Sequence, residues 1–80
     1  MKVCVLGLGY IGLPTALVLA DHGYDVLGFD INNSVVDSIN SGVAHFYEPD
    51  INSLLPKMLA TGRLRCSTQI EPVDTFVIAV

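Results

Sequence analysis

Charge is scarce in this sequence, and basic residues are the scarcest charged type. Only 15% of the 80 residues are charged, and the four basic ones are Lys2, Lys57, Arg63 and Arg65. They form no basic stripe, which is the electrostatic footprint of a nucleic-acid-binding protein. With a formal net charge of −4, the composition excludes nucleic acid as an expected partner.

Cysteine is also scarce. Cys4 and Cys66 lie far apart, and the sequence has no Cys-x-x-Cys pair and no Cys/His cluster. The usual zinc-ligand patterns are therefore missing, and nothing supports a disulfide. We expect two buried free thiols in a reducing cytoplasm and no metal site.

Charge is missing altogether between Lys2 and Asp21. Such an apolar run could be read as a signal peptide or a membrane helix. However, three glycines and a proline interrupt it, and no convincing small-residue cleavage pattern precedes Asp21. Its first half is β-branched and its second half is rich in Ala and Leu, so we expect a strand followed by a helix and no membrane span.

What the sequence does contain is an alternation of strand-like and helix-like segments. Apolar, β-branched strand-like segments lie at 2–7, 24–31, 63–68 and 75–80. Helix-like segments lie at 11–22, about 34–42 and about 49–62. Strands that alternate with helices predict a parallel sheet with right-handed crossovers. We therefore expect an α/β fold, the N-terminal part of a Rossmann-type doubly wound sheet with strand order 3-2-1-4.

Two local features modify the expected helices. Asn33 or Ser34 is expected to cap the second helix, and Ser34 with Asp37 three residues later resembles a capping box. In the third helix, Pro56 lies in the middle of the apolar pattern. A proline there removes a backbone hydrogen bond, so we expect a kink or a split near Leu55.

Gly7, Gly9 and Gly12 form a G-x-G-x-x-G motif between the first strand and the first helix. Gly7 allows a tight turn, Gly9 lets a pyrophosphate approach the backbone, and Gly12 lets the helix pack close to the strand. The N–H groups near Tyr10 and Ile11 can then point at phosphate oxygens, where the helix dipole favours negative charge. An ordinary strand-to-helix turn is the alternative reading of these glycines.

Asp30 follows the second strand, 18 residues beyond Gly12. This is the spacing expected of the acidic residue that accepts hydrogen bonds from the adenosine ribose in a dinucleotide site. A carboxylate there disfavours the 2′-phosphate of NADP, and no arginine follows in the next residues, so we expect NAD. Alternatively, Asp30 only ends a strand or caps a helix.

The composition also bears on domain organisation. Apolar residues make up 51% of the chain, more than we expect for an independent domain with so much surface. The last six residues, Thr75 to Val80, form an apolar run with no turn or polar tail after it. We therefore expect residues 1–80 to be the N-terminal portion of a larger NAD-binding Rossmann domain.

The strings "GLGYIGLPTA", "GFDIN", "EPD" and "FVIAV" resemble the N-terminus of the UDP-glucose/GDP-mannose dehydrogenase family. The resemblance covers the whole chain, and the Tyr-Ile-Gly-Leu-Pro extension makes it more specific than the glycines alone. Within the family, "VAHFYEPD" and "NSVVDSIN" are most similar to UDP-N-acetyl-D-mannosamine dehydrogenases. UDP-glucose members more often have a basic residue and a glycine where Val35 and Asp50 stand here.

The resemblance implies an oxidoreductase of polysaccharide biosynthesis. Such enzymes use NAD to oxidise the C6 alcohol of a UDP-sugar, here UDP-N-acetylmannosamine or UDP-glucose, to the uronic acid in two steps. A cysteine holds the intermediate, but neither Cys4 nor Cys66 matches it, so no catalytic residue is expected among these 80. The resemblance further implies a cytoplasmic homo-oligomer when the enzyme is full length.

Two other functions are compatible with the same residues. One is another NAD-dependent dehydrogenase, of the hydroxyacyl-CoA or phosphogluconate type, which shares the glycine turn and the acidic residue. The other is an NAD-binding regulatory or sensor domain without catalysis. An intact protein that forms no NADH from any UDP-sugar would favour the other dehydrogenase class. The absence of a catalytic cysteine and lysine elsewhere in the protein would favour the regulatory domain.

Overall fold

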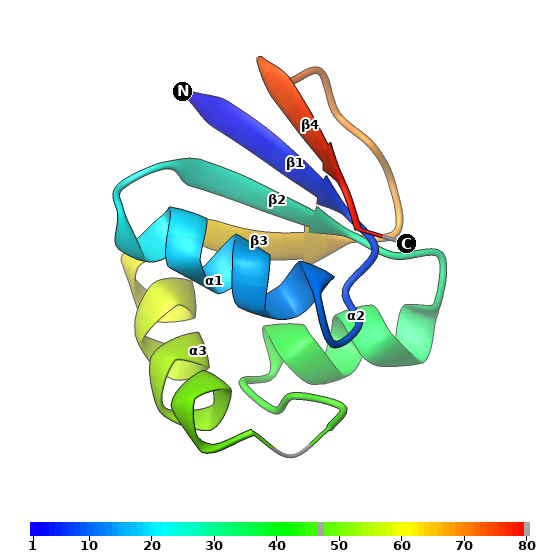
Figure 1. Ribbon diagram of the computed structural model, residues 1–80. Coiled ribbons are helices and arrows are strands. Elements are labelled where there is room, and N and C mark those ends of the chain that lie inside the picture. The colour runs from blue at the N-terminus through cyan, green and yellow to red at the C-terminus, as the bar shows by residue number, and fades with distance from the viewer. Residues whose placement is uncertain (47, 80) are drawn as a thin grey trace.

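The computed structural model describes residues 1–46 and 48–79. Four parallel strands form one sheet, and three helices lie together on one side of it (Figure 1). Along the chain the elements are β1 (Lys2–Leu6), α1 (Gly12–Asp21), β2 (Asp25–Phe29), α2 (Asn33–Asn40), α3 (Pro49–Thr61), β3 (Leu64–Ser67) and β4 (Thr75–Ile78). The predicted α/β class is confirmed.

The strands lie in the order β3-β2-β1-β4, as the sequence predicted. In the register of the sheet, Val5 is opposite Gly28 on one side and Val77 on the other, and Gly28 is opposite Cys66. The chain therefore runs outward from β1 to β3 and then returns to the other side of β1. Ligands of open α/β sheets bind outside the carboxyl ends of the strands at such a reversal.

The core lies between the sheet and the helices. Its strand residues are apolar side chains on one face of the sheet, and its helix residues come from all three helices, for example Leu17, Ile39 and Leu55. The apolar stripe predicted for the third helix is confirmed, because Ile51, Leu55 and Met58 are buried there. The two central strands also bury apolar side chains on the second face of the sheet, Cys4 in β1 and Leu27 in β2.

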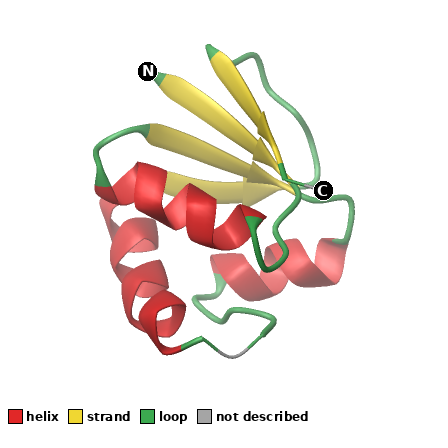
Figure 2. Ribbon diagram, in the orientation of Figure 1, coloured by secondary structure: helices red, strands yellow, loops and turns green. Residues whose placement is uncertain are grey.

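The opposite face of the sheet is crossed by the connection from β3 to β4, residues 68–74, whereas every helix lies on the other side (Figure 2). Arg65 of β3 fastens this connection, because its guanidinium donates two hydrogen bonds of 2.7 Å to the carboxylate of Glu71. Asp74 fastens its end, with its carboxylate 2.8 Å from the backbone nitrogen of Lys2. The crossing segment is thus held at both ends.

The predicted strand boundaries are one or two residues too long. The second strand ends at Phe29, so Asp30 is the first residue of the following loop, where its side chain turns back toward β1. The last strand ends at Ile78, and the predicted end at Val80 lies outside the described residues.

The predicted cap of α2 is wrong. Asn32 is the N-cap, and its Oδ1 accepts hydrogen bonds from the N–H groups of Ser34 and Val35 at 2.9 and 3.4 Å. Ser34 already lies within the first turn, so it cannot form a capping box with Asp37. Asn32, Asn33 and Ser34 all favour the N-cap position, and the structure uses the first of them, whose own N–H donates to Asp30 Oδ1.

Pro56 does not split the third helix, which is continuous from Pro49 to Thr61. Pro56 lies on the exposed side of α3, and so does Asn52, whose carbonyl loses its intrahelical donor. Water can satisfy that carbonyl, so the helix continues.

Among the described residues, no helix has the length and apolar character needed to cross a bilayer.

Candidate nucleotide-binding site

The glycine motif forms a turn at the carboxyl end of β1. Gly7 has a φ of 99°, a left-handed conformation that favours glycine. Its N–H donates a hydrogen bond of 2.8 Å to the carbonyl of Phe29 at the end of β2. The turn therefore begins with the chain bent sharply and tied to the neighbouring strand.

Gly12 is the first residue of α1 and packs against the end of β1. A β-carbon at Gly12 would lie 1.6 Å from the carbonyl oxygen of Gly7, which no side chain can tolerate. The helix can start this close to the strand only because residue 12 is glycine. The packing role predicted for Gly12 is seen directly in this contact.

Gly9 is different, because nothing in the described chain requires a glycine there. A β-carbon would meet no atom within 4 Å, and the backbone is not left-handed. The space beside Gly9 is open to solvent. Because Gly9 has no side chain, a ligand in this open space can approach the backbone at the start of the helix.

The start of α1 offers unpaired backbone donors to that space. The N-cap residue Ile11 makes no side-chain cap, and intrahelical bonding begins with Leu13, whose N–H donates to the carbonyl of Gly9. The N–H groups of Tyr10, Ile11 and Gly12 have no hydrogen-bond partner among residues 1–46 and 48–79. Unpaired N–H groups at the positive end of a helix dipole form a favourable site for an anion.

Asp30 joins this turn to the loop after β2. Its Oδ2 accepts a hydrogen bond of 3.1 Å from the N–H of Leu8, and its Oδ1 accepts one of 3.0 Å from the N–H of Asn32. The carboxylate is thus held at the carboxyl ends of β1 and β2 with one bond to each loop. Each oxygen keeps a further lone pair that can accept a hydrogen bond from a ligand hydroxyl.

An apolar cavity of about 410 Å³ opens beside Asp30. It lies above the carboxyl ends of β1, β2 and β4, and its walls are formed by Leu6, Gly7, Phe29, Asp30, Ile31, Ile70 and Ile78. The volume is that of a small-molecule site. Asp30 is its one charged wall residue, so the cavity can take a flat apolar group while the carboxylate binds a polar group at its rim.

Sequence reasoning missed the isoleucines of this cavity. Ile31 and Ile70 come from two different loops, and 86% and 53% of their surfaces are exposed. The sequence signal available for Ile31 was its position directly after the predicted ribose-binding residue, Asp30. Ile70 carries no such sequence signal, because only the fold brings the β3–β4 connection to this edge.

The cysteines lie away from this site and are unsuited to reaction. Both Cys4 and Cys66 are buried free thiols, as predicted. Burial raises the pKa of the Cys66 thiol to about 12, so it stays protonated at neutral pH. Within the described part of the chain, moreover, no three side chains of the metal-binding types cluster together.

Three other ionisable side chains take structural positions. The ring of His22 hydrogen-bonds the carbonyl of Val18 at the end of α1, with 2.8 Å between the atoms. Glu48 is the N-cap of α3 and accepts from the N–H of Asp50. His45 packs edge-on against Phe46, and the ring of Phe46 also contacts the ring of Tyr10.

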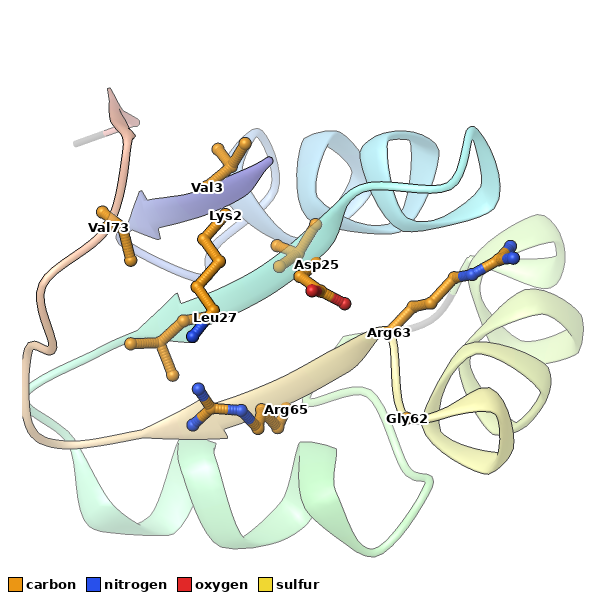
Figure 3. Close-up of a pocket in the computed structure, with 9 residues that line it drawn as sticks. Lys2, Val3, Asp25, Leu27, Gly62, Arg63, Arg65 and Val73 are labelled. Carbon is orange, nitrogen blue, oxygen red and sulfur yellow. The ribbon is translucent and has the colours of Figure 1, made fainter.

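A second cavity, of about 230 Å³, lies at the amino ends of the strands (Figure 3). Lys2, Asp25 and Arg65 line it from three neighbouring strands, and Arg63 lies at its rim. Arg65 is already paired with Glu71, and Asp25 adds a negative charge. Because it lies at the opposite end of the sheet from the glycine turn, this cavity does not contribute to the same site.

Comparison with known proteins gives one consistent result. A family model described as the UDP-glucose/GDP-mannose dehydrogenase family, NAD binding domain, matches residues 1–80. UDP-N-acetyl-D-mannosamine dehydrogenase of Pyrococcus horikoshii is 48% identical over 83 aligned residues, which cover 100% of this chain and 20% of that protein. NDP-N-acetyl-D-galactosaminuronic acid dehydrogenase of Ralstonia nicotianae is 51% identical over 78 residues, which cover 98% of this chain and 18% of that protein.

The three-dimensional comparison agrees. The structure of UDP-N-acetyl-mannosamine dehydrogenase from Staphylococcus aureus superposes with a TM-score of 0.97 at 45% identity, covering 100% of this chain and 19% of that one. The chain thus spans about a fifth of the length of the proteins it matches.

Proposed function

Because the chain belongs to the UDP-glucose/GDP-mannose dehydrogenase family and matches its NAD-binding domain, we propose that residues 1–80 bind the ADP portion of NAD. The family resemblance read from the sequence is confirmed, and NAD is the cofactor that the family's domain binds. The observation that carries the proposal is the position of the unpaired N–H groups of Tyr10 and Ile11 at the same sheet edge as the Asp30 carboxylate.

The pyrophosphate of NAD lies against the glycine turn in this proposal. The N–H groups of Tyr10, Ile11 and Gly12 donate to its oxygens, and the open side of Gly9 lets them approach. Gly7 shapes the turn, and it also lines the cavity beside Asp30.

The adenosine lies beside the pyrophosphate. Asp30 accepts hydrogen bonds from the ribose hydroxyls, and the apolar cavity between Ile31 and Ile70 takes the adenine ring. A 2′-phosphate would place a second negative charge next to this carboxylate. The four basic residues of the chain all lie outside residues 30–40, so none of them follows Asp30 to offset the repulsion, and NAD is preferred over NADP.

We further propose that these residues work as the N-terminal portion of a longer NAD-binding domain in a cytoplasmic, homo-oligomeric nucleotide-sugar 6-dehydrogenase. The relatives are dehydrogenases of nucleotide sugars, which supports UDP-N-acetylmannosamine, or UDP-glucose, as substrate. Bound NAD would supply the hydride acceptor for the two oxidations from the C6 alcohol to the carboxylate. The residues described here hold the cofactor and do not act on the sugar.

Substitution of Gly9 tests the binding proposal. Gly9→Val in the intact protein should abolish measurable NAD binding in calorimetry while leaving the thermal unfolding midpoint close to that of the wild type, because a side chain at residue 9 meets only open space. Gly12→Ala is the matched comparison, since its β-carbon strikes the Gly7 carbonyl and should lower stability as well as binding.

Unchanged NAD affinity in Gly9→Val would contradict the proposed binding site. The activity is tested separately, by following NADH formation from a panel of UDP-sugars. NAD binding without turnover of any UDP-sugar would instead favour a different NAD-dependent dehydrogenase or a regulatory domain.

A further inference from the structure

We propose that Phe46 is a positioning residue for the pyrophosphate-binding turn and that it acts through the ring of Tyr10. The inference rests on the proposed function, because it concerns how the same turn is held ready for NAD. Phe46 lies in the connection between α2 and α3, far from the glycine motif in the sequence.

The turn is held firmly at its two ends. At its start, the side chain of Leu8 is completely buried and its N–H is bonded to Asp30. At its end, Gly12 packs directly on the carbonyl of Gly7. The middle is different, because the side chains of Tyr10 and Ile11 are 77% and 72% exposed. Their N–H groups also have no hydrogen-bond partner within the part of the chain that the structure describes.

Phe46 supports the middle of the turn from outside. The rings of Tyr10 and Phe46 lie with their centroids 4.4 Å apart and their planes tilted by 35°, which is a favourable aromatic contact. Phe46 itself is half-buried and packs against the hydrophobic core, and the ring of His45 meets it edge-on at 4.8 Å. Tyr10 is thereby connected to the core through a loop that is separate from the nucleotide turn.

The contact affects the donors because the side chain and the backbone nitrogen of Tyr10 are bonded to the same α-carbon. Fixing the ring restricts rotation of the adjoining peptide planes, which carry the N–H groups of Tyr10 and Ile11. Donors already aimed at the ligand bind it without an additional ordering cost. Loss of the aromatic contact should therefore weaken binding of a pyrophosphate and leave the adenosine region unchanged.

A double-mutant cycle in the intact protein tests this inference. Tyr10→Leu, Phe46→Leu and the double variant keep apolar side chains and remove the rings. Their dissociation constants for NAD, ADP-ribose and adenosine are measured by calorimetry. We expect each single variant to bind NAD and ADP-ribose roughly three- to tenfold more weakly, the factor that corresponds to one aromatic pair. The double variant should be no weaker than either single one.

Adenosine affinity should stay at the wild-type value in all three variants. Phe46→Tyr, which keeps the ring, should restore NAD affinity, and Val43→Ala, an exposed change in the same loop, should have no effect. Equal weakening of adenosine and NAD, or additive losses in the double variant, would overturn the positioning role. A wild-type protein that binds no NAD would refute the proposed function itself, which is a separate result.

Discussion

The side chain of Leu8 lies directly over Gly28, with Leu8 Cδ2 only 2.9 Å from the position that a β-carbon of Gly28 would take. Leu8 is the residue between the first two glycines of the motif, and it is fully buried. The nucleotide turn is therefore fastened into the core by a side chain that fits because the neighbouring strand has none at this point.

This relationship predicts the effect of Gly28→Ala. The added methyl group would press on Leu8 and on the Sγ of Cys66, which is also 2.9 Å away. We expect the free energy of unfolding in urea to fall by about 1–3 kcal/mol, the usual cost of overpacking a core. Gly9→Ala adds the same methyl group in open space and should change stability by less than about 0.5 kcal/mol. Equal effects of the two substitutions would refute the close fit.

Asp30→Ser should weaken NAD binding and relax the preference against NADP. The variant loses the charged acceptor of the ribose hydroxyls, and hydrogen bonds to charged groups contribute about 1.5–3 kcal/mol. We expect a rise of roughly tenfold to a hundredfold in the dissociation constant for NAD, with a smaller loss or a gain for NADP. Asp37→Asn, an exposed change on α2, serves as the control. An equal loss of affinity for NAD and for NADP would mean that Asp30 only holds the loops together.

Asn40→Leu should destabilise the outer edge of the sheet. The side chain of Asn40 donates to the carbonyl of Cys66 at 2.8 Å and accepts from its N–H at 3.1 Å. Removing it leaves a partly buried backbone donor and acceptor of β3 unpaired, which costs about 1–3 kcal/mol. Urea unfolding measures the change, and Asn52→Leu on the exposed side of α3 is the matched control.

The Arg65–Glu71 pair predicts a small acid-dependent loss of stability. The hydrogen bonds from Arg65 lower the pKa of the Glu71 carboxyl below its usual range. Because the carboxylate form is favoured in the folded state, the pair stabilises the protein at neutral pH. That contribution is lost as pH falls through the lowered pKa.

Urea titrations across this acidic range would compare the wild type with Glu71→Gln. The difference in unfolding free energy should shrink toward zero in acid, and it should also shrink in high salt because both groups are solvent-exposed. A difference that stays constant over the whole pH range would show that the ion pair does not contribute.

Much of the fold could be predicted because its signals are local. The β-branched runs, the Ala- and Leu-rich composition of the first helix and the apolar stripe of α3 each depend on neighbouring residues, and together they predicted the correct strand order. The turn at Gly7 and Gly12 could be predicted for the same reason. The cap of α2 was placed too late, because Asn32, Asn33 and Ser34 are consecutive residues that all favour the N-cap position.

The surroundings of the candidate site depend on contacts between distant segments. Gly28 appeared to be an ordinary strand residue, although a glycine inside a strand can mark a close approach of another group. The wall formed by Ile70 and the contact of Phe46 with Tyr10 bring together segments that no periodicity connects. The contribution of these residues became visible only when the chain was seen folded.

The two outer edges of the sheet differ in one further respect. On β3, the amide of Asn40 already occupies the outward-facing backbone groups of Cys66. On β4, the other end strand, no described strand covers the outer edge. A further parallel strand can thus extend the sheet beside β4, whereas beside β3 it would have to displace the Asn40 amide from Cys66. Adding a strand beside β4 would place β1, and the glycine turn that follows it, nearer the middle of the sheet.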